Sequence, residues 1–395
     1  MKYVITKSAE VAALAERLAN EPYITVDTEF LRDSTYYAKL CLIQVAGANE
    51  AVCIDPLADG IDLQPIYDLF ADPKIEKVFH AARQDLEIFF QETGQVPTPL
   101  FDSQVAAMVC GYGDSVGYEQ LVREIAKAKL DKSNRFTDWS RRPLSDKQIK
   151  YALGDVTHLR TIYEHLKKQI KAQNRCHWIA EEMAVLTNPD TYVVKPEDAW
   201  QRLKLRSTEP LFVLTAQKLA EWREAEAQRR NLPRNRVIKD DVLLELAAQR
   251  PSDQDAIERV RGLGGNAWGK TGEALLKTIR QALSTPAEDR PKIERKQPIS
   301  SEAAAAMELL KVLLKGRAAA HSVATKMIAT TADLEELATA AVNGVDADLL
   351  VLKGWRREVF GEHAERLIAG ELALGLNNGE IVEFPQPSAS QQAAE

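Results

Sequence analysis

The sequence predicts an α/β domain at the N-terminus followed by all-helical domains, and three observations support this prediction. Strand-like and helix-like patterns alternate from residue 23 to about residue 110. Beyond Gly111 the pattern is helical almost throughout. The 395 residues also exceed the ~100–200 residues of one ordinary domain. We therefore expect an α/β sheet covered by helices, with one or two helical bundles behind it.

The α/β part begins with three strand-like runs, which are rich in apolar and β-branched residues and are separated by turn residues. They are residues 23–30, 40–46 and 51–55, and they predict a meander of neighbouring strands. Helices are then expected at 63–71, 81–92 and 103–110, and strands at 77–80 and 99–102.

One later helix is particularly well marked in the sequence. Ser145 and Gln148 have the spacing of a capping box, and Pro143 precedes them. Apolar residues recur at helical intervals from Ile149 to Leu166. We expect this helix to run from about residue 146 to 168.

Composition divides the remainder of the chain. Residues 285–299 are rich in proline and charge and have too few apolar residues to pack, so they predict a linker. The expected organisation is an α/β domain at 1–170, a helical connector at 171–206, a bundle at 207–284, that linker, a second bundle at 300–376 and a disordered tail at 377–395.

The composition argues against a membrane protein and against a disulfide-rich secreted protein. The first twenty residues lack the apolar stretch of a signal peptide, and no later segment approaches the ~20 apolar residues that span a bilayer. Cys41, Cys53, Cys110 and Cys176 are widely scattered, so we interpret them as core or incidental thiols. A cytoplasmic location is the expectation.

Charge is unevenly distributed along the chain. The net charge is −7, yet residues 202–239 carry +6 and the remainder −13. Such asymmetry suits a basic phosphate-binding surface attached to an acidic body, because phosphate contacts need only local positive charge. A solvated helix face is the alternative interpretation.

Two carboxylates lie side by side on the first strand-like run. Asp27 and Glu29 are two residues apart between apolar neighbours, and residues so spaced on a strand point to the same face. Two like charges there are unfavourable unless cations neutralise them, and oxygen ligands suit Mg²⁺ or Mn²⁺. The alternative is an exposed strand face with two solvated acids.

Two further acids occupy comparable positions. Asp85 follows a short strand in the first turns of the next helix. Tyr151 and Asp155 are four residues apart on the well-marked helix, which places them on one face. Gly154, inside that helix, suggests close approach of a backbone or ligand, although a packing contact explains it equally well.

These residues carry a family resemblance. Asp27-x-Glu29, Asp85 at the end of a His-x-x-x-x-Asp run, and Tyr151-x-x-x-Asp155 resemble the three motifs of the DEDD superfamily of 3′→5′ exonucleases, in its tyrosine-bearing branch of ribonuclease D type. The resemblance covers about residues 1–170. It implies a ribonuclease H-like fold with a mixed sheet flanked by helices.

The resemblance also implies hydrolysis of phosphodiester bonds with two divalent ions, Mg²⁺ or Mn²⁺, and release of nucleoside 5′-monophosphates. Asp27 would contact both ions, Glu29 and Asp155 would complete one site, and Asp85 would hold the second ion. Tyr151 would orient the attacking water, because a phenol with a pKa of ~10 stays protonated at neutral pH.

Other residues near the motifs are weaker candidates for a role in catalysis or binding. Phe30 can stack on the terminal base or simply be a core aromatic. Asp102 precedes a helical run, so we interpret it as a helix cap. For His80 and His158 we expect structural roles.

The helical region resembles a second family. Residues 208–283 are similar to the helicase and ribonuclease D C-terminal (HRDC) domain, and 300–374 to a diverged copy whose role in binding is doubtful. The matching residues of the first are Leu219, Trp222, Arg223, Ala227, Asn231, Pro233, Val237, Asp241, Leu243, Leu246, Ala247, Pro251, Ile257 and Gly262. The expected phosphate contacts are Arg223, Arg229, Arg230, Arg234, Arg236 and Lys239.

Residues 264–271 match a nucleotide-binding phosphate loop letter for letter. Such a loop must follow a buried strand, yet residues 254–263 are charged and helical in pattern. We therefore interpret the segment as a loop between helices and expect no nucleotide cofactor.

The sequence thus predicts a 3′→5′ exoribonuclease that trims structured RNA, with transfer RNA precursors as the substrate that the family implies. A DNA exonuclease is an alternative, because chemistry directed at the backbone does not choose the sugar. A catalytically silent RNA-binding scaffold is a second alternative.

Overall fold

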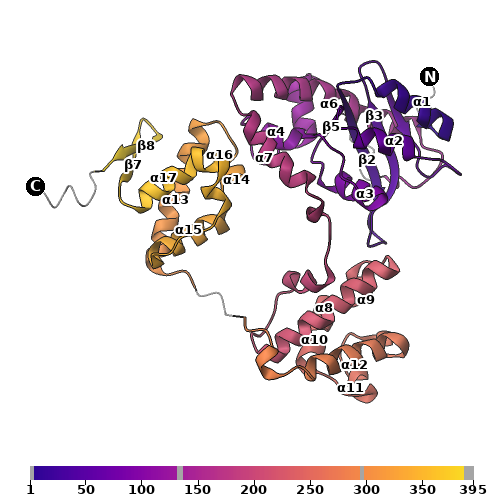
Figure 1. Ribbon diagram of the computed structural model, residues 1–395, viewed down its shortest axis with the longest axis vertical. Coiled ribbons are helices and arrows are strands. Elements are labelled where there is room, and N and C mark those ends of the chain that lie inside the picture. The colour runs from indigo at the N-terminus through magenta and orange to yellow at the C-terminus, as the bar shows by residue number, and fades with distance from the viewer. Residues whose placement is uncertain (1–3, 131–136, 294–297, 387–395) are drawn as a thin grey trace, which may run out of the picture. The chain divides into compact units, whose positions relative to one another are not determined.

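A computed structural model of the chain describes residues 4–130, 137–293 and 298–386 (Figure 1). The chain forms two compact units. One contains the chain up to Glu29, residues 42–191 and the chain from Pro298 on; the other contains residues 30–41 and 192–297. Residues 294–297 of the expected linker lie outside the described residues.

The N-terminal domain is built on a mixed sheet of six strands in the order β1-β4-β3-β2-β5-β6. The pairs β1–β4, β2–β5 and β5–β6 are parallel, and β3–β4 is antiparallel. The predicted meander is therefore confirmed as β2, β3 and β4, whereas β1 was not predicted. The strands are Val4–Ile5 (β1), Tyr23–Leu31 (β2), Lys39–Ala46 (β3), Ala51–Ile54 (β4), Glu76–Phe79 (β5) and Leu100–Asp102 (β6).

Helices cover this sheet (Figure 1). The well-marked helix is α6, which begins at Asp146 with the predicted capping box at Ser145 and ends at Ala172, four residues later than expected. Its apolar positions, including Val156 and Leu159, are buried, and it packs against α4, β4 and β5. The others are α1 (Ser8–Leu18), α2 (Gln64–Ala71), α3 (Arg83–Thr93), α4 (Ser103–Val109), α5 (Tyr118–Leu121), a π-helical turn (Val122–Ala126) and α7 (Cys176–Thr187).

The first helical bundle has its own apolar core, to which α8, α10 and α12 contribute residues such as Leu219, Leu243 and Ile279. A helical domain in this part of the chain agrees with the prediction. The helices are α8 (Pro210–Arg230), α9 (Arg234–Val237), α10 (Asp240–Gln249), α11 (Gln254–Glu258) and α12 (Gly269–Leu283), with 3₁₀ turns at Pro196–Arg202, Gly264–Ala267 and Ala287–Asp289. A further 3₁₀ turn, Pro189–Thr191, follows α7 in the N-terminal unit.

The second helical module packs against α7 of the N-terminal domain. The indole rings of Trp178 and Trp355 stack with centroids 4.5 Å apart, and Trp355 Nε1 donates to Glu182 2.9 Å away. Arg356 forms an ion pair with the same carboxylate at 2.8 Å. The helices are α13 (Ser301–Ala320), α14 (Thr325–Ile328), α15 (Thr331–Asn343), α16 (Gly354–Arg356) and α17 (Glu362–Ile368), with a 3₁₀ turn at Leu350–Leu352 and a π-helical turn at Arg357–Gly361.

The expected disorder from residue 377 is wrong as far as the described chain reaches. Leu372–Asn377 (β7) and Glu380–Pro385 (β8) form an antiparallel hairpin. Asn378 and Gly379 at its turn have φ values of 51° and 85°, as a two-residue hairpin loop requires. Glu383 ties the hairpin to the bundle through Arg317 at 3.3 Å and His363 at 2.6 Å. Residues 387–395 of the expected tail lie outside the described residues.

Within the described ranges, the structure contains no helix with the length and apolar character needed to cross a membrane.

Candidate metal centre

The sheet position of β2 brings its carboxylates under α6. Thr25, Asp27 and Glu29 alternate along β2 and so share one face of the strand. The Thr25 hydroxyl donates to the carbonyl of Val156 at 2.8 Å, which fixes α6 across that face. Asp155 precedes Val156 in α6 and is therefore held above the two strand carboxylates.

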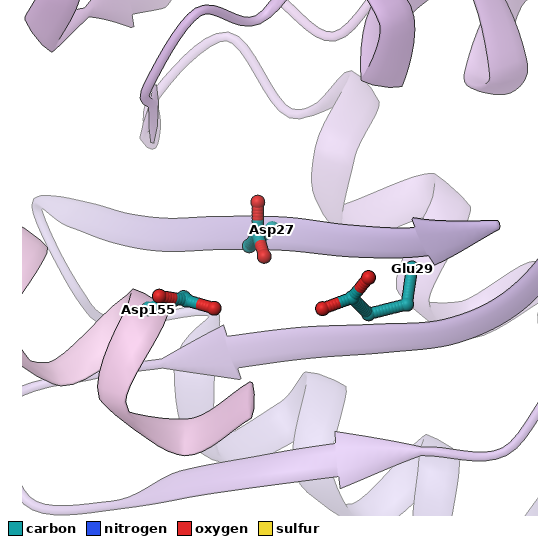
Figure 2. A group of neighbouring side chains, drawn as sticks. All are labelled: Asp27, Glu29 and Asp155. Carbon is teal, nitrogen blue, oxygen red and sulfur yellow. The ribbon is translucent and has the colours of Figure 1, made fainter. Parts of the chain in front are cut away.

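Three carboxylates converge at this point. Asp27, Glu29 and Asp155 each offer an oxygen, and these oxygens all lie within 4.8 Å of one another. Figure 2 shows Glu29 on the strand and Asp155 on the helix turned toward the same space, with Asp27 beside them. The predicted convergence of acids distant in sequence is present for these three residues.

Asp85, the fourth predicted acid, lies at the edge of this group. It is buried near the start of α3, and its Oδ1 accepts a hydrogen bond from the Thr28 hydroxyl. Burial raises the pKa of Asp85 well above its ordinary value, and the charge of Asp27 raises it further. The charge of Asp27 thus acts on Asp85, although Asp85 is not one of the three converging carboxylates.

The electrostatics of the group favour a bound cation. Burial raises the pKa of Asp27 well above its ordinary value, with the charge of Asp155 adding to the effect. The pKa of Glu29 rises to about 10 through burial and the charges of Asp27, Asp155 and Asp85. Burial also raises the pKa of Asp155, to about 7. Divalent cations would relieve this repulsion, and all-oxygen donors suit Mg²⁺ or Mn²⁺.

Tyr151 lies next to the group, as the spacing of four along α6 predicts. A hydrogen bond from Tyr151 lowers the pKa of Asp155, against the larger effect of burial. The ring of Trp139 lies 6.1 Å from that of Tyr151, centroid to centroid, and Trp139 is buried. The phenol is therefore held beside the carboxylates by contacts on two sides.

Tyr118 is a neighbour of the site that sequence reasoning missed. Its hydroxyl donates to the carbonyls of Gly154 and Asp155, at 3.0 and 2.7 Å. A tyrosine on a four-residue helix after a loop has no pattern that would identify it. At Gly154 an added Cβ would meet only Leu130 Cδ2 at 3.7 Å, an ordinary contact, so among the described residues no neighbour approaches closely enough to require glycine there.

Two of the remaining nearby candidates, Asp102 and His80, make structural contacts, as predicted, whereas the roles expected for His158 and Phe30 stay predictions. Asp102 accepts hydrogen bonds from the backbone amides of Gln104 and Val105 at the start of α4, and from Ala81 and Ala82. His80 Nδ1 lies 2.9 Å from the Ser103 hydroxyl. His158 and Phe30 are half-buried.

Two of the predicted phosphate contacts are wrong. Arg223 is only 3% exposed and donates to the Ile238 carbonyl and to Asp240. Arg234 forms a two-bond ion pair with the fully buried Glu224. Both guanidinium groups stabilise the bundle, because each forms an ion pair with a carboxylate of the same bundle, Asp240 or Glu224.

The other four basic residues are exposed: Arg229, Arg230, Arg236 and Lys239. Arg229 and Arg230 both lie near Glu226, at 2.8 and 3.7 Å. Surface pairs of this kind are weak and leave the cations accessible to phosphate.

The segment that matches a phosphate loop connects two helices, as predicted, and its last residues, 269–271, begin α12. Residues 264–267 form a 3₁₀ turn between α11 and α12, and the element before it is a helix rather than a strand.

Removing one carboxylate is expected to stabilise the metal-free protein, and more so at high pH. The folded-state pKa of Glu29, about 10, lies above its ordinary value of ~4.3. Folding therefore takes up a proton between these values, and stability falls as the pH rises through that window. Glu29→Gln removes this pH dependence, because glutamine does not titrate. The variant should therefore have a higher free energy of unfolding than the parent, and the difference should be larger at about pH 8 than at about pH 6. Urea denaturation in EDTA measures this, and an equal difference at both values would contradict it.

Comparison with known proteins places the two parts of the chain in described families. Residues 3–171 match the family model described as a 3′-5′ exonuclease, and residues 215–279 match that of the HRDC domain.

Full-length relatives agree with these matches. The chain is 53% identical to ribonuclease D of Jannaschia sp. (strain CCS1), covering 96% of this chain and 99% of that protein. It is 47% identical to ribonuclease D of Granulibacter bethesdensis, covering 96% and 95%. The crystal structure of Escherichia coli RNase D, described as an exoribonuclease involved in structured RNA processing, superposes with a TM-score of 0.82 at 30% identity, over 93% of this chain and 99% of that one.

Proposed function

Since the chain belongs to the ribonuclease D family of 3′→5′ exoribonucleases, we propose that it trims structured RNA with two divalent cations held at the carboxylate site. The observation that carries this proposal is the convergence of Asp27, Glu29 and Asp155 with raised pKa values. Transfer RNA precursors with 3′ extensions are the proposed substrate.

We propose a division of roles among the acidic residues. Asp27 would help to hold both cations, Glu29 and Asp155 would complete one site, and Asp85 would serve the other. When bound, the pair of cations would stabilise the attacking and leaving oxygens of an in-line displacement. The protein supplies fixed oxygen donors, and its β2–α6 packing holds them in place before the substrate arrives.

Tyr151 is proposed to orient the attacking water through its hydroxyl. Tyr151→Phe keeps the ring beside Trp139 but removes this hydrogen bond. We expect kcat for RNA shortening to fall about tenfold, because misplacing the nucleophile raises the barrier without weakening substrate binding. Steady-state kinetics on a 3′-labelled RNA measure the effect; an unchanged kcat, or a loss confined to KM, would exclude this role.

The helical parts are proposed to position the RNA. Arg229, Arg230, Arg236 and Lys239 are exposed on the first bundle and would contact phosphates, whereas Arg223 and Arg234 are excluded from this role. We keep the domain boundaries 1–170 and 207–284 as part of the proposal, and we extend the second module from 300–376 to Pro385, because the β7–β8 hairpin is tied to it.

We also propose the cytoplasm as the compartment. All four cysteines are free thiols, which is typical of a reducing environment.

The direct test compares matched RNA and DNA strands labelled near the 5′ end, together with a transfer RNA that carries a 3′ extension. We expect stepwise shortening of RNA from the 3′ end in Mg²⁺, release of nucleoside 5′-monophosphates and no reaction in EDTA. Preferential shortening of DNA would favour the DNA exonuclease, and binding of RNA without shortening would favour the scaffold.

A further inference from the structure

The loop between β2 and β3 belongs to the first helical bundle rather than to the sheet. The boundary between the two compact units falls between Glu29 and Phe30, inside β2, and residues 30–41 share a unit with the bundle. Among residues 32–38, all of which the structure describes, Tyr36 alone is buried. Its ring is part of the apolar core of the bundle.

The Tyr36 hydroxyl lies in a dense network of polar groups. It donates to Glu224, which is fully buried in α8, and accepts from Arg234 at 3.0 Å and Gln228 at 3.2 Å. The guanidinium of Arg234 also lies 4.8 Å from the centroid of the Tyr36 ring. The hydroxyl therefore uses its donor and two acceptor positions, which defines the orientation of the ring.

One further contact holds the loop, and another orients its partner Gln228. The amide of Tyr37 donates to Asn231 at 3.0 Å, and Gln228 also donates to the Val194 carbonyl at 2.9 Å. Burial raises the pKa of Glu224, but the hydrogen bonds from Arg234 and Tyr36 outweigh it and keep that pKa below its ordinary value. The carboxylate thus stays ionised and continues to accept both bonds.

The anchored loop is continuous with the strand that carries the metal ligands. Glu29 is the last residue of β2 in the N-terminal unit, and seven residues later the chain is fixed at Tyr36. The other residues of the loop are exposed or half-buried, so Tyr36 is the buried anchor that follows the end of β2, in addition to the pairing of β2 with its neighbours in the sheet.

We propose that Tyr36, held by Glu224 and Arg234, is a positioning residue that fixes the C-terminal end of β2 and thereby the placement of Asp27 and Glu29. The first bundle would then act on the reaction through the strand as well as through RNA. This inference rests on the proposed metal site, and it assigns to Arg234 a role different from phosphate contact.

The test uses the full-length protein and two readouts. Tyr36→Phe and Glu224→Gln each remove part of the network while nearly keeping side-chain shape. The matched control is Asp240→Asn, which weakens the ion pair with Arg223, the neighbour of Glu224 on the same helix, without touching the loop. Amide hydrogen exchange in EDTA measures how well the backbone of β2 is held. The affinity for Mn²⁺ is measured by titration, from the decrease of the electron paramagnetic resonance signal of free Mn²⁺.

We expect Tyr36→Phe and Glu224→Gln to speed exchange at the end of β2 and to weaken Mn²⁺ binding about tenfold, the usual effect of losing a group that supports metal ligands. Asp240→Asn should change neither. Unchanged exchange and affinity in Tyr36→Phe, or equal changes in the control, would overturn the proposal. If the parent protein bound no Mn²⁺, the proposed metal site would fail, and the exchange data alone would decide whether Tyr36 positions β2.

Discussion

Replacing Asp155 with alanine is expected to slow RNA shortening in Mg²⁺ by at least about a hundredfold, because Asp155 is a proposed metal ligand and its loss would remove a cation from the site. The substitution deletes the carboxylate that α6 contributes to the cluster with Asp27 and Glu29. It also relieves repulsion, since the charge of Asp155 helps to raise the pKa values of both neighbours. The protein should therefore remain folded while activity is lost.

Single-turnover rates on a 3′-extended transfer RNA, with circular dichroism to verify folding, measure this effect. Asp68→Ala is the matched control, because Asp68 is an exposed carboxylate on α2 outside the cluster. Its rate should equal that of the parent. A folded Asp155→Ala protein that retains the parent rate would favour the RNA-binding scaffold over the nuclease.

Trp355→Ala is expected to reduce the free energy of unfolding by about 3–5 kcal/mol, the usual range for a buried aromatic residue. Trp355 is among the largest fully buried side chains, and it stacks on Trp178 of α7. The truncation also leaves Glu182 without the indole donor. The second helical module would then lose its main contact with α7.

Urea denaturation with Leu350→Ala as a control measures this prediction. Leu350 belongs to the same module but is 57% exposed, so its truncation should change stability by less than about 0.5 kcal/mol. A loss below about 1 kcal/mol for Trp355→Ala would mean that the stacking and hydrogen bond do not hold this module in place.

The carboxylate cluster was predictable because its residues lie on regular elements. The two-residue period of a strand pairs Asp27 with Glu29, and the spacing of four on a helix pairs Tyr151 with Asp155. Neither spacing predicts how the helix packs on the strand. The hydrogen bond from Thr25 to α6, which brings the two pairs together, is therefore visible only in the structure.

The wrong predictions concern Arg223, Arg234 and the C-terminal hairpin, whose structures depend on contacts that were not apparent in the sequence. In the sequence Arg234 resembles a phosphate-binding residue. In the structure its guanidinium instead pairs with Glu224 and donates to Tyr36, which is 198 positions away. Arg223 is neutralised by Asp240 across a turn between helices. The hairpin at Asn378-Gly379 did carry a turn signal between two short, largely apolar runs, and this signal was overlooked.

Crystals soaked in Mn²⁺ offer the most direct test of the proposed two-cation site. Anomalous scattering should reveal two ions, one among Asp27, Glu29 and Asp155 and the other between Asp27 and Asp85. A map with no Mn²⁺ among these carboxylates, from crystals that shorten RNA when dissolved, would contradict the assignment of the site.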